Sequence, residues 1–178
     1  MRQRPKINPI DRRPEIDGLR AIAVLVIILY HAKIVIFGRD WFEGGYIGVD
    51  IFFVISGYLI TRIILEELFK TGSFSFLKFY ERRVRRILPM LFTVMLVTFP
   101  FAWKYLLPAN FLEYSKSILS AVLFSSNFFF YFVTTEYGAE SALLKPFLHT
   151  WSLGVEEQFY IVFPILLVFF YKFLRKHM

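Results

Sequence analysis

Residues 81–107 have the sequence ERRVRRILPMLFTVMLVTFPFAWKYLL, in which four arginines precede a long, mostly apolar run. A helix needs about 20 such residues to cross the ~30 Å hydrocarbon core of a bilayer. Lys and Arg residues collect at the cytoplasmic ends of membrane helices. This stretch therefore predicts a membrane-spanning helix over residues 87–107 that begins on the cytoplasmic side.

Four further apolar runs lie on either side of this stretch, at residues 19–37, 47–65, 117–133 and 151–174. The run at 117–133 is shorter than the others and is interrupted by Ser and Asn residues, which favours a short or re-entrant helix. We predict an all-α, polytopic integral membrane protein with four full transmembrane helices plus this shorter one. Five spans result if residues 117–133 cross completely.

The distribution of basic residues predicts the orientation. Residues 1–17 form a basic N-terminal segment, which we expect in the cytoplasm, and residues 18–178 form the membrane domain. The loop at 66–86 and the C-terminus are also basic and are predicted inside, whereas the loop at 134–148, which holds only Lys145 as a base, is predicted outside. These assignments agree only if residues 117–133 do not cross the membrane completely.

The composition narrows the class of protein further. Of 178 residues 57% are hydrophobic, the formal net charge is +7 and cysteine is absent. Such a chain is too apolar to be disordered, and it cannot form disulfides or thiolate metal sites. Its bases flank apolar runs, so the lipid bilayer is the expected partner and nucleic acid is not. No metal site and no bound cofactor are predicted.

Ionisable residues inside membrane helices are candidates for function. Arg20 and His31 are 11 residues apart, which places them on one face of a helix about 16 Å apart. His31 can serve as a general base on a hydroxyl, or it can simply pack against a neighbouring carbonyl. Asp50, expected at a similar depth, can hold the imidazole as the acid of a triad does, or it can cap its helix.

Two further groups of polar residues have the same ambiguity. Arg83 and Arg86 are three residues apart on one helix face and can clamp a phosphate, although such bases also bind anionic lipid. His149, Trp151 and Glu156 stand at the start of the last apolar run, where they can form a site or an interfacial cap with an aromatic belt residue. By helical spacing Glu157 points away from this group.

Four segments together resemble the acyltransferase-3 family of membrane proteins. They are RPEIDGLRAIAV at 13–24, followed by His31, then GYIGVDIFFVISGYLI at 45–60, FYERRVRRILP at 79–89 and HTWSLGVEEQFY at 149–160. Their order along the chain makes the resemblance specific. It covers nearly all of the chain and is nearest to the O-acetyltransferases of lipopolysaccharide O-antigen and related envelope glycans.

The resemblance implies a function and a set of roles. The family transfers an acyl group, usually acetyl, from cytoplasmic acyl-CoA to hydroxyls of cell-envelope carbohydrates, which predicts a bacterial inner-membrane enzyme with acetyl-CoA as its donor substrate. The implied roles fall into three groups: His31, Asp50, His149 and Glu156 in catalysis; Arg20, Arg83 and Arg86 in donor binding; and Ser56, Gly57 and Trp151 along the channel or acceptor site.

The chain also departs from the family in length. It corresponds to the N-terminal half of the family's membrane domain, so we expect its partner to be the C-terminal half or a second copy of this chain. One alternative is a truncated, non-catalytic membrane fragment of the family. Another is a small transporter component in which His31 and Asp50 relay protons.

Overall fold

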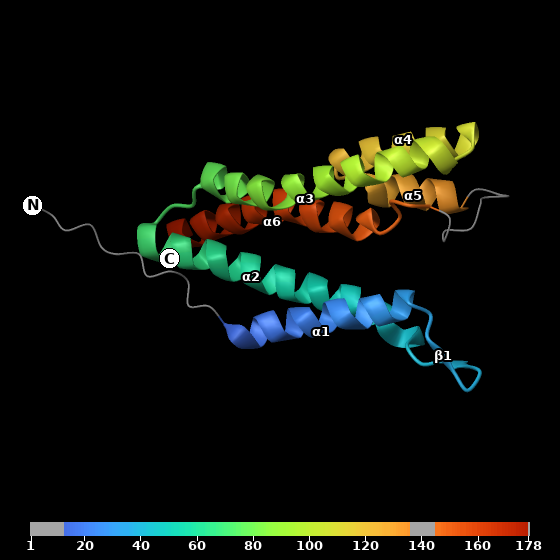
Figure 1. Cartoon of the computed structure of the whole chain (residues 1–178). Coiled ribbons are helices and arrows are strands. Elements are labelled where there is room, and N and C mark those ends of the chain that lie inside the picture. Colours follow the sequence, from blue (N-terminus) through green and yellow to red (C-terminus); the bar gives the residue numbers. More distant parts are fainter. Residues whose placement is uncertain (1–12, 136–144, 178) are drawn as a thin grey trace, which may run out of the picture. The chain divides into compact units, whose positions relative to one another are not determined.

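The computed structural model describes residues 13–135 and 145–177, and almost all of this part is helical (Figure 1). Most of the basic segment 1–17 and of the predicted outer loop lies outside the described residues. The elements are, in order, α1 (Pro14–His31), β1 (Val35–Ile36), β2 (Arg39–Asp40), η1 (Glu43–Tyr46), α2 (Ile47–Thr71), α3 (Phe76–Tyr105), α4 (Pro108–Val122), α5 (Ser126–Thr135) and α6 (Thr150–His177).

The chain divides into two compact units, and the boundary between them falls within α2, after Leu59. The first unit holds α1, a small antiparallel hairpin of β1 and β2, η1 and the first half of α2. The second holds the rest of α2 and all of α3 to α6. Each unit is described by itself.

The first predicted span, 19–37, is wrong at its far end. Helix α1 begins earlier, at Pro14, where the missing N–H of proline costs nothing, and it ends at His31. The chain then turns through left-handed backbone at Lys33, Phe37 and Gly38 and forms the hairpin. Apolar composition alone continued the predicted helix through residues that the structure uses for a turn.

Helix α1 contacts the start of the second helix through two glycines. A Cβ atom on Gly45 would lie 2.6 Å from the Tyr30 Cβ, and one on Gly48 would lie 2.6 Å from the backbone oxygen of Ala23. Both distances are shorter than any real contact, so the two backbones approach closely only because these residues lack side chains. Small residues serve this purpose widely in membrane helices.

We expect Gly48→Ala to loosen the contact between α1 and α2, because the added methyl group meets a backbone carbonyl that cannot move aside. Overpacking of this kind costs about 1–3 kcal/mol. Thermal unfolding of the chain in detergent measures the loss. Gly44→Ala is the matched control, since a Cβ there has nothing within 4 Å. Equal melting temperatures for the two variants would contradict the close approach.

In the second unit, α6 runs antiparallel to α3 (Figure 1). The Tyr80 hydroxyl at the start of α3 donates to backbone oxygens of Tyr160 and Ile161, at 3.3 and 3.1 Å. Further along α6, the Tyr171 ring meets Phe69 near the end of α2, with centroids 5.7 Å apart. The end of α6 therefore lies beside the connection between α2 and α3, where the basic residues of all three helices gather.

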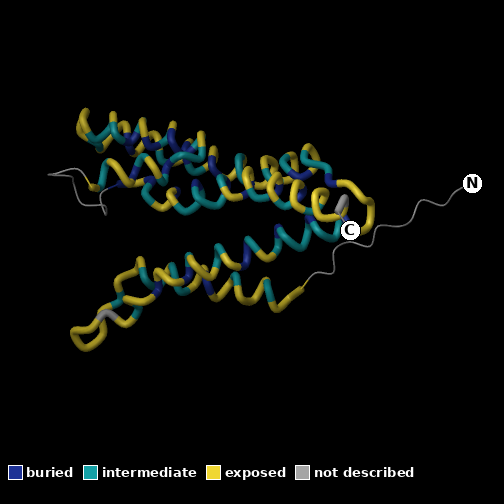
Figure 2. Tube along the Cα trace, turned by 180° about the vertical axis from the view of Figure 1, so that it is seen from behind, coloured by how far each residue is buried: buried dark blue, intermediate teal, exposed yellow. Residues whose placement is uncertain are grey.

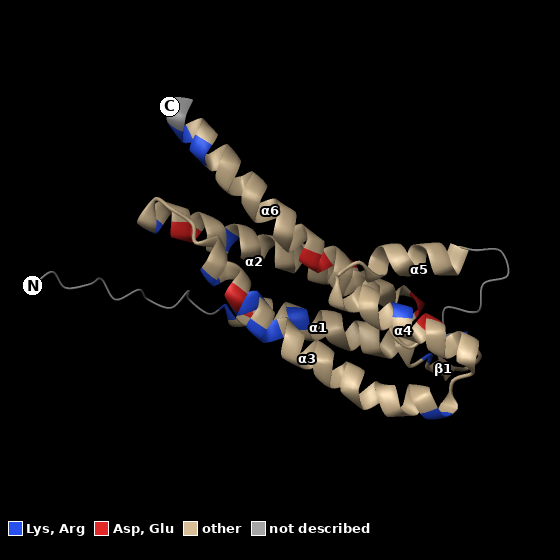
Figure 3. Ribbon diagram, turned by 90° about the horizontal axis from the view of Figure 1, so that it is seen from above, with Lys and Arg blue, Asp and Glu red and all other residues tan. Residues whose placement is uncertain are grey.

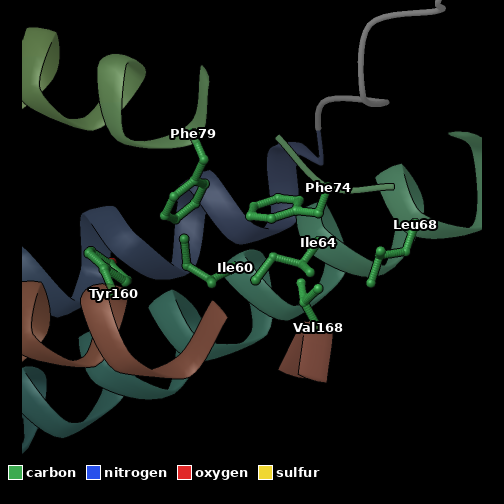
Figure 4. Close-up of a cluster of buried hydrophobic side chains, with 7 residues drawn as sticks. All are labelled: Ile60, Ile64, Leu68, Phe74, Phe79, Tyr160 and Val168. Carbon is green, nitrogen blue, oxygen red and sulfur yellow. The ribbon is translucent and has the colours of Figure 1, made fainter. Parts of the chain in front are cut away.

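The core of this end of the unit is a cluster of buried side chains from α2, α3, α6 and the connection between α2 and α3. Figure 4 shows them pointing toward one another: Ile60, Ile64, Leu68, Phe74, Phe79, Tyr160 and Val168. A second cluster joins α3, α4 and α5 to the segment before α6, with Leu91, Tyr114, Phe130 and Phe147 among its members. The contacts in these two clusters hold α6 antiparallel to α3.

The segment 117–133 does not form one continuous helix. Helix α4 ends at Val122, Phe124 adopts a left-handed conformation with φ 52°, and α5 begins at Ser126 and packs back against α4. The Ser117 and Ser120 hydroxyls bond to backbone carbonyls one turn earlier. The structure thus agrees with the prediction of a short helix here, and the α4–α5 hairpin lets α6 start at the end of the unit where α3 stops.

By length and composition, three of the described helical segments can cross a membrane: Glu43–Thr71, Phe76–Tyr105 and Thr150–Arg175. Long stretches of α3 and α6 carry no charged residue (Figure 3), and exposed residues lie along every helix (Figure 2), with large apolar ones such as Leu96 among them. Helix α1 is not among the three, because Glu15, Asp17 and Arg20 occupy its first two turns. The prediction of an all-α membrane protein is confirmed.

Candidate functional site

The Arg83 side chain on α3 contacts an aromatic ring on α6. The Arg83 Cζ atom lies 3.8 Å from the centre of the Tyr160 ring and 5.7 Å from that of Phe79. A guanidinium within about 6 Å of an aromatic centroid is attracted by the ring quadrupole, and the attraction is stronger where water is excluded. Arg83 is half-buried at this point. Its first role in the structure is therefore to hold the two helices together.

Two neighbouring carboxylates on α6, those of Glu156 and Glu157, differ in their hydrogen bonding. The Tyr160 hydroxyl donates to the Glu156 carboxylate. Glu157 is 7% exposed, and its Oε1 atom has no hydrogen-bond partner in the described part of the chain. The charges of Arg83 and Arg86 act on Glu157. A buried carboxylate is costly unless such charges compensate it.

Glu157, predicted by helical spacing to point away from His149 and Glu156, lies on the buried face of α6, which that spacing did not anticipate. Buried residues recur every three or four positions along α6, at Thr150, Gly154, Glu157, Tyr160, Pro164 and Val168. This stripe faces the interior of the unit and includes Glu157. The helical spacing that singled out Glu156 was measured from His149, which lies in the turn before α6 and so does not set the buried face.

Arg86 lines a pocket of about 300 Å³ between α3 and the start of α6. His149 and Thr150 are the other polar residues at its surface. The rest of the lining is apolar: Ile87, Met90, Leu91, Val94, Phe147 and Leu153. The structure therefore brings together one predicted donor-binding residue and one predicted catalytic residue, which are 63 positions apart in the sequence.

The four arginines at the start of α3 have different surroundings. Arg85 pairs with Glu81 at 2.8 Å on the exposed side of α3, and Arg82 is exposed. Arg83 packs on aromatic rings, while Arg86 lines the pocket. Arg83 and Arg86 were predicted as an equivalent pair, and the structure distinguishes them.

The remaining predicted residues on α1 and the first half of α2 lie in the first unit. Arg20 and His31 share helix α1 as predicted, with the Arg20 Cζ atom 5.2 Å from the centre of the Phe52 ring. His31 is the last residue of the helix, is exposed, and places its ring edge-on to Tyr30 with centroids 5.1 Å apart. Ser56 is buried and Gly57 is partly buried on α2.

The expected pairing of His31 with Asp50 is absent: no hydrogen bond or ion pair joins them among the described residues. The register of the two helices explains this. Gly48 lies against Ala23 and Ile27, so Asp50 is displaced from His31 by about 12 Å along the helix axes at 1.5 Å per residue. Asp50 is exposed there.

The predicted site residues thus fall into two sets. Arg20, His31, Asp50, Ser56 and Gly57 belong to the first unit, and Arg83, Arg86, His149, Trp151 and Glu156 belong to the second. Trp151 is 40% exposed at the start of α6. Within the described ranges no group of three or more His, Asp or Glu side chains is placed to hold a metal ion.

These features define a multi-pass helical membrane protein with a mostly apolar pocket that carries a guanidinium and an imidazole. The chain belongs to the acyltransferase-3 family, whose acyltransferase domain model matches residues 13–178.

It is similar to the O-acetyltransferase OatA of Staphylococcus aureus strain NCTC 8325 / PS 47, with 39% identity over 158 residues, which is 88% of this chain and 25% of that protein. It is also similar to the O-acetyltransferase SACOL0978 of Staphylococcus aureus strain COL, with 41% identity over 155 residues. That match covers 87% of this chain and 24% of that protein. The chain therefore spans about a quarter of the length of these relatives. No solved structure matches it.

The division of roles between the arginines predicts a difference in stability. We expect Arg83→Gln to lower the melting temperature of the chain in detergent, because it removes a cation from two aromatic faces, an interaction worth about 0.5–2 kcal/mol. Arg82→Gln removes the same charge from an exposed position and is the matched control. If the two variants had equal melting temperatures, the contact of Arg83 with Tyr160 would contribute nothing to the stability of the fold.

Proposed function

We propose that this chain forms the donor-binding part of a membrane O-acyltransferase. The enzyme moves an acyl group, in particular acetyl, from cytoplasmic acyl-CoA to a hydroxyl of a cell-envelope carbohydrate. One observation carries this proposal: Arg86 and His149 line a single, otherwise mostly apolar pocket. Membership of the acyltransferase-3 family and the O-acetyltransferase names of the relatives support the reaction class.

The pocket suits the chemistry of such a donor. Acyl-CoA carries phosphates, a long flexible arm and a thioester, and a guanidinium binds phosphate through forked hydrogen bonds. Apolar walls suit the arm and the acyl group. At about 300 Å³ the pocket is at the small end of ligand sites, so it fits the acyl end of the donor while the nucleotide stays outside.

The charge pattern supports a cytoplasmic donor. The arginine block at the start of α3 and the basic end of α6 lie at one end of the second unit, as the contact between Phe69 and Tyr171 requires. Basic residues at helix ends face the cytoplasm, so we place this end on the cytoplasmic side of a bacterial inner membrane. The basic residues of segment 1–17 give the N-terminus the same cytoplasmic assignment. Arg86 then lies on the path of a donor that enters from the cytoplasm.

The reaction needs a base and a leaving group. An imidazole takes the proton of the acceptor hydroxyl, and the oxygen attacks the carbonyl carbon of the thioester. The C–S bond breaks, the CoA thiolate leaves and takes up a proton, and an ester remains on the carbohydrate. His31 and His149 are both candidates for the base, one in each unit, and their variants separate the two roles.

The donor role of Arg86 is tested in inverted membrane vesicles that contain this chain and receive radiolabelled acetyl-CoA. We expect label on the envelope glycan. In Arg86→Gln the acetyl-CoA concentration for half-maximal transfer should rise about tenfold, since a hydrogen bond to a charged group is worth about 1.5–3 kcal/mol. Arg85→Gln, in the same block but paired with Glu81, should leave it unchanged. An unchanged dose response in Arg86→Gln would reject the donor role.

The same vesicles test the base. We expect His31→Gln to abolish transfer while insertion into the membrane stays intact, because glutamine cannot accept the proton. His149→Gln is measured beside it with identical donor. Transfer retained in His31→Gln and lost in His149→Gln would move the assignment to the pocket histidine.

A further inference from the structure

A buried ion pair lies outside the candidate site described above. The ammonium of Lys145, in the segment before α6, contacts the carboxylate of Glu113 on α4. Lys145 is 8% exposed. A small cavity of about 20 Å³ beside the pair has Asn110, Tyr114 and Ser117 at its surface.

Burial makes this pair matter energetically. A lysine is almost never buried unless it is paired, and removing one partner of a buried pair leaves an uncompensated charge. The two ends are unequal, because the Glu113 side chain is 31% exposed and the Lys145 side chain only 5%. Loss of Glu113 therefore strands a buried cation, whereas loss of Lys145 leaves a carboxylate that can still reach water.

Lys145 begins the series of turns that carries His149. The backbone oxygen of Lys145 accepts from the N–H of Leu148 at 3.1 Å, and that of Phe147 accepts from the N–H of Thr150 at 2.9 Å. A shift of Lys145 would therefore be transmitted along the backbone to His149, four residues later.

Side-chain contacts also connect this segment to helix α4. Phe147 is buried, with its ring centroid 5.6 Å from that of Tyr114 on α4. The His149 ring stacks on Phe147, with centroids 6.0 Å apart and planes 25° apart. Tyr114 is in turn hydrogen-bonded to Thr98 on α3 at 2.9 Å. The imidazole is thus supported through Phe147 by α4.

We propose that Lys145 and Glu113 are positioning residues for His149. Their ion pair fixes the turn before α6 on helix α4, and this holds the imidazole against Phe147 at the pocket that Arg86 also lines. The effect on catalysis rests on the proposed acyl transfer, but the effect on the geometry of His149 does not.

The number of histidines makes a direct test simple. The chain has three, His31, His149 and His177, so histidine-labelled protein in detergent gives three imidazole signals in an NMR spectrum, assigned by single substitution. The signal of His149 should be displaced by the ring of Phe147. In Glu113→Gln and Lys145→Glu we expect it to move toward the position of an unstacked histidine, while the His31 signal stays.

Two further variants separate positioning from loss of the fold. Lys145→Arg keeps the charge and should keep the His149 signal in place. The exchanged pair, Lys145→Glu with Glu113→Lys, should restore it. If the single variants do not fold, the exchanged pair decides: a His149 signal at its original position supports the proposal, and a displaced one overturns it. A His149 signal that does not move in the folded single variants also overturns it.

Transfer from labelled acetyl-CoA in the vesicles supplies the second readout. Because a displacement of about 1 Å in a catalytic group can cost up to 100-fold in rate, we expect Glu113→Gln to lower kcat about tenfold with little change in KM, and the exchanged pair to recover it. An unchanged kcat together with a displaced His149 signal would overturn the catalytic consequence. If the original chain transfers no label at all, the proposed function fails, and the NMR result still decides whether the pair positions His149.

Discussion

The contact of the Arg83 guanidinium with the Tyr160 ring is the interaction on which the second unit depends. It holds the start of α3 against the middle of α6, beside the hydrogen bonds from Tyr80 and above the apolar cluster of this end of the unit. Lipid provides no hydrophobic force between helices, so helices in a membrane associate through packing and through polar contacts. With the start of α3 held there, the next turns of the helix, including Arg86, line the pocket.

The break between α4 and α5 is the second condition for this arrangement. If residues 117–133 had formed one crossing helix, α6 would start at the opposite end and run parallel to α3. The turn around Phe124 prevents such a continuous helix. The Gln158 amide on α6 stabilises this turn by donating to the Phe124 backbone oxygen at 2.7 Å. His149 is thereby delivered to the pocket that Arg86 lines.

The long spans could be predicted from the sequence because about 20 apolar residues in a row have few alternatives to a membrane helix. The end of α1 could not be predicted in this way. The apolar run continues to Phe37, but the backbone turns at Lys33 and Phe37 and leaves the helix. The pairing of His31 with Asp50 failed for a different reason. It assumed a register between two helices, and that register depends on the approach at Gly48, which no spacing within one helix reveals.

The charged residues of α3 and α6 show why composition identifies the polar residues of a membrane protein but not their roles. Arg83, Arg86 and Glu157 are equally conspicuous in an apolar sequence, and each is costly to bury. Only the packing shows that the Arg83 guanidinium lies against aromatic rings, that Glu157 is buried, and that Arg86 lines a pocket. A phosphate that approached Arg83 would have to displace Tyr160, whereas one that approached Arg86 would meet the side chain directly. The arginine motif therefore combines one residue that contacts aromatic rings of two helices with one that lines the pocket.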